Sequence, residues 1–273
     1  MAGDWLKFKV VFILFNVVIV VSFLVIYLMP LAMLGWDYTR VFWTRNWGLP
    51  LLFAAILVAL NGYFGFNWKL FRLLEREEWD GLIEHLENRI FEKKIVLAQQ
   101  CRILINAYLV RSRLDSMDRL ESAVREARPR IMRRLVMSFG VRHLLSNDPG
   151  GMTEYFGEFK DRRVRDVGWV IWSYAFARLL DEDRDEAREQ LLRVIDSTRN
   201  GVLLVLSAYL LDGLGSERQD KLKTDLKTRF TPEKLSGEVE KQRSSVQVVI
   251  LSRLIEEATE WLHREPSERG DLH

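Results

Sequence analysis

The residues of this chain that are best able to do chemistry are four histidines, one cysteine and several acidic clusters, and their spacing matches no catalytic or metal-binding pattern. His85 follows Glu84, but neighbours in sequence point to different faces of a helix, and no second histidine lies three or four residues away. His263 and His273 lie near or in a polar stretch at the end, where we expect solvated side chains. We therefore expect no catalytic residue, no cofactor, no metal ion and no small-molecule substrate.

Two further motifs have structural explanations. Gly150-Gly151 follows no predicted strand and precedes no Lys-Ser or Lys-Thr pair, so it predicts a turn rather than a phosphate-binding loop. An acidic cluster lacks the spacing and the glycine of a calcium loop. It is expected to join two helices and to favour the N-terminus of the second by its charge. Its members are Asp181, Glu182, Asp183, Asp185 and Glu186.

A run of arginines is the strongest charged feature, and several of its side chains are expected to converge around a turn at Pro129. One interpretation is a solvated helix face. The other is contact with anionic lipid headgroups or with an acidic partner. The run comprises Arg125, Arg128, Arg130, Arg133 and Arg134.

The elements that precede these residues are apolar. The chain carries no charge from Val10 to Trp36. This stretch is longer than the roughly 20 residues needed to cross a bilayer and longer than the apolar segment of a signal peptide, which has roughly 7 to 15 residues. A second uncharged segment follows from about residue 49, where Pro50 suits a first helical turn. We predict a two-helix transmembrane hairpin in residues 1–68, with spans at about 10–34 and 49–66.

Side chains within and beside the spans predict how the hairpin is arranged. Asn16 and Ser22 are expected to mark a contact between helices, because hydrogen-bonding groups prefer protein to lipid. The connection carries Arg40 and Arg45, whereas five basic residues lie on the side shared by both ends. This bias favours cytoplasmic termini, at a bacterial inner membrane, although a periplasmic or lumenal domain stays open. The five residues are Lys7, Lys9, Lys69, Arg72 and Arg76.

The remainder of the chain is charged and helical in pattern. Apolar residues recur there at three- and four-residue spacing without sustained alternation, which predicts an all-α domain. Only four of the 40 basic and two of the 38 acidic residues precede residue 67, so this domain is balanced in charge. A nucleic-acid partner is therefore not expected, because such proteins are normally basic. The single Cys101 excludes an intrachain disulfide.

Bulky residues recur in this domain at intervals of 33 to 35 residues, namely Leu74, Tyr108, His143, Phe176 and Tyr209. The unit around Phe176 is the clearest. It is made up of Trp169, Trp172, Ser173 and Phe176, followed by Ala187 and Leu191. The pattern resembles the tetratricopeptide repeat, whose period is about 34. It is degenerate, because the unit of Val202, Val205, Leu206 and Tyr209 lacks the family's small residue.

The resemblance implies an α-α repeat solenoid over residues 69–230, with Pro129 at the family's closing proline. Cys101 stands where the family has a buried tryptophan, which implies an inert core thiol. His143 stands at a bulky position, which implies a packed histidine rather than a ligand. We also expect the second span to run directly into the first repeat helix around residues 68–79.

The family's first helices line a concave groove, and the resemblance places 11 side chains in it. About half of them are apolar, which would suit an amphipathic helix. The occupant is either a protein partner or the chain's own helix near 246–261. The groove residues are Gln99, Arg102, Asn106, Arg134, Met137, Val141, Val170, Tyr174, Arg178, Leu203 and Ser207.

The C-terminal part is expected to close the solenoid. Residues 231–262 should form a capping helix, and residues 263–273 a polar tail. One apolar face is predicted for that helix, formed by Val246, Val249, Ile250, Leu254, Ala258 and Trp261.

These features together favour a membrane-anchored, non-enzymatic scaffold or assembly adaptor that binds a protein partner through its repeat groove and lipids through its anchor. One alternative is a structural subunit of a larger membrane complex, of the secretion or flagellar type. Another is a membrane enzyme or transporter component, which the absence of charge within the spans disfavours.

Overall fold

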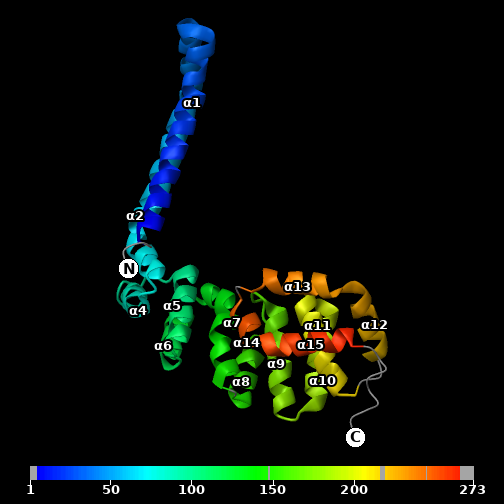
Figure 1. Ribbon diagram of the computed structural model, residues 1–273. Coiled ribbons are helices and arrows are strands. Elements are labelled where there is room, and N and C mark those ends of the chain that lie inside the picture. Colours follow the sequence, from blue (N-terminus) through cyan, green and yellow to red (C-terminus); the bar gives the residue numbers. More distant parts are fainter. Residues whose placement is uncertain (1–4, 147, 216–218, 244, 265–273) are drawn as a thin grey trace. The chain divides into compact units, whose positions relative to one another are not determined.

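The computed structural model describes residues 5–146, 148–215, 219–243 and 245–264, and every regular element among them is helical (Figure 1). The predicted all-α class is thereby confirmed. The chain divides into two compact units, residues 1–92 and 93–273. The predicted polar tail, including His273, lies largely outside the described residues.

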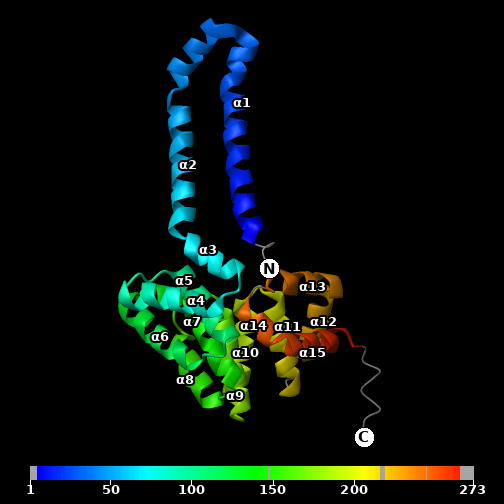
Figure 2. The ribbon, with the colours of Figure 1, turned by 60° about the vertical axis from the view of Figure 1, so that its left-hand side comes forward.

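The first unit contains an apolar hairpin of helices α1 (Trp5–Asn46) and α2 (Gly48–Phe66) (Figure 2). Both helices are long and apolar enough to cross a membrane, and the most apolar window of each contains no buried residue. Helix α1 kinks at Gly35, whose φ of 79° suits glycine because a Cβ disfavours this region. The first predicted span ends at this kink.

Amide and aromatic side chains join the two helices of the hairpin. Asn61 Nδ2 donates to Asn16 Oδ1 at 2.8 Å, and the rings of Phe23 and Phe53 stack with centroids 4.0 Å apart. The predicted role of Asn16 as a helix contact is confirmed. Ser22, in contrast, is exposed.

Three short helices complete the first unit: α3 (Trp68–Glu75), α4 (Trp79–Glu87) and the π-helix η1 (Asn88–Glu92). The prediction that the second span continues directly into the next helix is wrong, because Asn67 between α2 and α3 has non-helical dihedral angles. A second break follows α3, where Glu77 adopts a positive φ of 53°. The helices α3 and α4, expected at the start of the repeat array, cluster with the hairpin instead.

The second unit is built from antiparallel helices in which each packs on the next along the chain. Large side chains without solvent exposure fill its core, among them Trp172, Tyr108, Phe139 and Phe156. The helices are α5 (Ala98–Val110), α6 (Asp115–Ala127), α7 (Pro129–Ser146), α8 (Pro149–Phe159), α9 (Val167–Leu180), α10 (Arg184–Ser197), α11 (Gly201–Gly213) and α12 (Gln219–Arg229).

Side-chain caps fix where several of these helices begin. Asp183 accepts a hydrogen bond from the amide of Glu186, so the acidic cluster starts α10 as predicted. Asp148 caps α8 through the amide of Gly151 at 3.0 Å. The prediction of a turn at Gly150-Gly151 is wrong, since both lie in the first turn of α8. A Cβ on Gly151 would lie 2.3 Å from the Asp148 carboxylate, so the glycine leaves room for the cap.

The C-terminal segment forms three helices rather than one: α13 (Pro232–Lys241), α14 (Val246–Ile250) and α15 (Ser252–His263). The break at Leu251 shifts the helical phase, so the predicted apolar face holds only in part: Ala258 is buried, whereas Val249 faces solvent. Val249 is 58% exposed. Besides Ala258, the buried apolar side chains are Val248, Leu251, Ile255 and Leu262, none of which was predicted.

Candidate functional site

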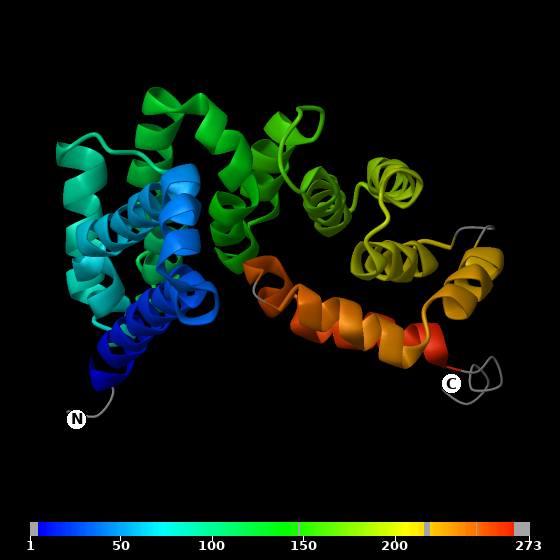
Figure 3. The same ribbon diagram turned by 90° about the horizontal axis from the view of Figure 1, so that it is seen from above.

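The C-terminal segment lies along the helices that were predicted to line a groove (Figure 3). Helix α14 packs on α7, and α15 packs on α11 and α12. The chain's own C-terminal helices, one of the two predicted occupants, thus contact two of the four helices that were predicted to line the groove, α7 and α11.

Polar contacts hold the C-terminal segment in place at both ends of α11. Glu238 accepts a hydrogen bond from the first amide of α11, that of Gly201, at 2.8 Å. At the other end, Trp261 Nε1 donates to Asp212 at 2.8 Å. His263 lies between two carbonyl oxygens, those of Thr259 at 2.9 Å and Phe230 at 3.1 Å. The prediction of a solvated His263 is therefore wrong.

The predicted groove residues separate into three groups. Tyr174 and Arg178 contact other parts of the unit. The Tyr174 ring lies 4.1 Å from Lys160 Nζ and against Gly157, and Arg178 pairs with Asp183. Buried side chains form the second group, Met137, Val141, Val170, Leu203 and Ser207. Exposed polar side chains form the third, Gln99, Arg102, Asn106 and Arg134.

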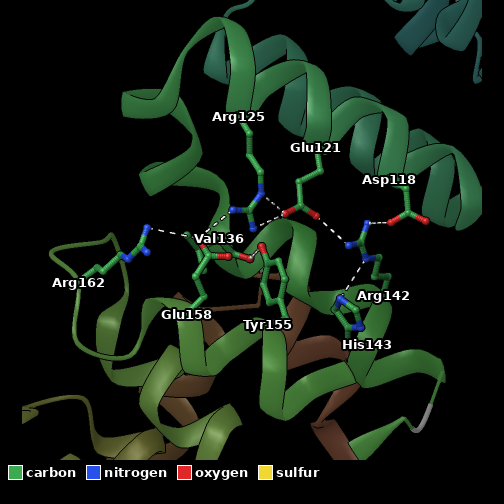
Figure 4. A network of polar contacts seen from close by, with 9 residues as sticks. All are labelled: Asp118, Glu121, Arg125, Val136, Arg142, His143, Tyr155, Glu158 and Arg162. Atoms are coloured by element: carbon green, nitrogen blue, oxygen red, sulfur yellow. Dashed lines mark hydrogen bonds and ion pairs between the residues drawn. The ribbon is translucent and has the colours of Figure 1, made fainter. Parts of the chain in front are cut away.

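A polar network that the sequence analysis missed joins α6, α7 and α8 (Figure 4). Its centre is Glu121, whose side chain is only 6% exposed and contacts Arg125 at 2.7 Å and Arg142 at 2.8 Å. Arg125 also contacts Glu158 at 2.9 Å, and Arg142 pairs with Asp118. The spacing of Glu121 and Arg125 on one helix suggests their pairing, but no local pattern reveals that Arg142 joins them.

This network borders an open cavity of about 320 Å³, yet its groups are engaged with one another. Tyr155 donates its hydroxyl proton to the Val136 carbonyl at 3.0 Å, and its burial raises its pKa well above the usual value. Burial, followed by the charge of Arg142, lowers the pKa of His143, so the imidazole is neutral at pH 7. Glu121 is held by two guanidinium groups. The arrangement joins three helices through paired charges.

The predicted arginine run is divided between two places. Arg125 belongs to the network just described, whereas Arg128, Arg130, Arg133 and Arg134 are exposed. Three of the exposed arginines line a separate open pocket of about 450 Å³ together with Arg163 and Arg165, which the sequence analysis missed. The loop between α8 and α9 carries both missed residues.

Cys101 and His143 are packed as the resemblance implied. The Cys101 side chain is fully buried, and the His143 ring is half-buried with its centroid 5.0 Å from that of Tyr155. Over the described part of the chain, no group of three or more histidine, cysteine or acidic residues is arranged to hold a metal ion.

The buried thiol yields a testable expectation. Burial raises the pKa of Cys101 to about 11, so its thiolate fraction at neutral pH is roughly 100-fold below that of an ordinary thiol. The native chain in mild detergent should react with N-ethylmaleimide at least 100-fold more slowly at pH 7.5 than the chain unfolded in urea. Equal rates in the two states would show that this part of α5 is open.

The chain is thus an all-α protein with an apolar helical hairpin and a domain of stacked helices. A family model described as "Uncharacterised Treponema protein" matches residues 116–264, more than half of the chain, so the protein belongs to that family. An "Uncharacterized protein" of Treponema pallidum (strain Nichols) is 23% identical over 279 residues, which cover 94% of this chain and 88% of the relative. No solved structure matches significantly. The family match covers the polar network, the arginine pocket and the C-terminal helices.

Proposed function

We propose that this protein is a membrane-anchored, non-enzymatic adaptor that holds a protein partner beside the membrane. The unburied apolar surface of α1 and α2 carries the proposal, because surface of this kind is stable in lipid and prone to aggregation in water. We propose that the protein lies in a bacterial inner membrane with both termini in the cytoplasm, because more basic residues flank the spans on the side of the termini than in the connection.

The second unit supplies the binding part of the adaptor, as a degenerate tetratricopeptide-like array. Its close packing supports that assignment. Gly140, at the family's small position, lies so near Phe156 on the next helix that a Cβ would approach the ring to 2.5 Å. Ser173, at the corresponding position two helices later, is fully buried.

The structure favours a polar docking surface over an apolar one. Helices α14 and α15 pack on α7 and α11, and the apolar groove positions of these two helices are buried, whereas α5 and the start of α7 keep their polar side chains exposed. We therefore assign the partner to the surface of Gln99, Arg102, Asn106 and Arg134.

Site-specific photocrosslinking in intact membranes tests this proposal. A photoreactive residue at Asn106 should capture one defined protein, and the exposed Arg199 on a distant connection serves as the control position. Adding Arg102→Glu should abolish the crosslink at position 106, whereas Lys227→Glu on α12 should leave it unchanged.

The outcomes separate the proposed adaptor from the alternative of a structural subunit. Crosslinks to several proteins from both positions would favour a subunit packed within a larger complex. Loss of membrane association in alkaline carbonate would overturn the anchor itself.

A further inference from the structure

The proposed function leaves most of one feature unused, the arginine pocket, defined as Arg130, Arg133, Arg134, Arg163 and Arg165 with Ile131. Only Arg134 also belongs to the proposed partner surface. Two separate segments build it, the first turns of α7 and the loop between α8 and α9. A backbone hydrogen bond from Arg165 N to the Arg133 carbonyl, 2.9 Å long, fastens the loop to the helix. The structure thereby places five arginine residues along the lining of one open hollow of about 450 Å³.

The charge of this pocket is almost uncompensated. Only Arg165 approaches a carboxylate, that of Asp166 at 3.6 Å, and the other four arginines form no ion pair within the described part of the chain. Arginines elsewhere in the same unit do pair. Examples with a carboxylate partner are Arg125, Arg142, Arg178, Arg188 and Arg193.

The position of the pocket adds to its positive potential. The N-terminus of a helix carries partial positive charge and normally attracts acids. Helix α7 has no acidic residue in its first turn and carries Arg130 there. A bound anion would reduce the repulsion among the arginines. It would also reduce the repulsion between them and the partial positive charge at the N-terminus of α7.

We infer that the arginine pocket binds a phosphate-bearing ligand. The planar guanidinium group donates two parallel hydrogen bonds to phosphate oxygens, and several converging guanidinium groups favour more than one phosphate. The ligand is either the headgroup of an anionic phospholipid or a soluble polyphosphate. The lipid source rests on the proposed membrane anchor, and the soluble source does not.

Binding to the full-length chain in non-ionic detergent tests the inference. The site variant combines Arg133→Gln with Arg163→Gln, one change from each segment. A matched control combines Lys221→Gln with Lys227→Gln, which removes two exposed cations from α12. Pyrophosphate binding is measured by calorimetry at constant ionic strength, and cardiolipin binding by native mass spectrometry from mixed micelles.

We expect saturable binding of at least one probe, weakened about tenfold or more by the site variant and less than twofold by the control. Binding of cardiolipin alone identifies a lipid site, and binding of pyrophosphate identifies a soluble phosphate site. Because the altered side chains are exposed, the site variant should keep the helical signal of the native chain. Its unfolding midpoint without ligand should be equal or higher, since repulsion is removed. The inference is overturned if neither probe binds saturably, or if both variants lose affinity equally.

Discussion

Removal of residues 245–273 is expected to destabilise the second unit so strongly that the remaining chain aggregates or binds a hydrophobic dye. The deletion takes four large aliphatic side chains from the core: Val248, Leu251, Ile255 and Leu262. At about 1.5 to 3 kcal/mol for each, the loss is comparable with the roughly 5 to 15 kcal/mol that stabilises a typical domain. It also uncovers the parts of α7 and α11 on which α14 and α15 pack.

A single substitution gives a milder test of the same surface. Ile255→Asp places a charge where the side chain is only 5% exposed, whereas Arg253→Asp changes a nearby side chain that is 92% exposed. The thermal midpoint of the helical signal should fall by several degrees or more for the first change and little for the second. If the truncated chain keeps the native midpoint and binds no dye, the C-terminal helices do not stabilise the groove.

Glu121→Leu is expected to lower the free energy of unfolding of the second unit by roughly 3 to 5 kcal/mol. The reason is that Arg125 and Arg142 both contact the buried Glu121 carboxylate, and Arg142 is itself only 16% exposed. Removing the shared carboxylate leaves a guanidinium group with fewer partners in a partly desolvated position.

Chemical unfolding in detergent, followed by circular dichroism, measures this effect. Glu154→Gln is the matched control, because it removes an exposed carboxylate that borders the same cavity. In a double-mutant cycle, Arg142→Met should cost much less in the Glu121→Leu background than alone. Additive effects of the two changes would show that the contact between α6 and α7 contributes little.

Local pattern was sufficient to predict the helical class and the apolar hairpin. An uncharged stretch from Val10 to Trp36 has few other stable environments, and Asn16 inside it needed a polar neighbour, which the structure supplies as Asn61. The acidic start of α10 was equally predictable, because capping depends on residues that are close in sequence.

The predictions that failed depended on the helical phase of a segment or on contacts between residues that are distant in sequence. The break at Leu251 shifts the helical phase of the C-terminal segment, so a face drawn through a single helix includes the buried Ala258 but also the exposed Val249. Tyr174 was placed in the groove by the repeat pattern, yet Lys160, at the C-cap of the preceding helix, supplies a cation against its ring. Arg163 and Arg165 join the arginine pocket only because a loop folds back to α7, which no spacing in the sequence reveals.

The placement of α14 and α15 also determines the order in which apolar surfaces are exposed and covered during translation. Both helices leave the ribosome after α7 and α11, the helices that they cover. During translation the apolar surfaces of α7 and α11 are therefore exposed, after the N-terminal hairpin has been made. A nascent chain at this stage exposes first the apolar surface of α7 and then that of α11. The surface of α11 becomes covered only when α15 has been made. Chaperone capture of chains stalled through an added C-terminal extension should accordingly drop once the extension is long enough to let α15 leave the ribosome.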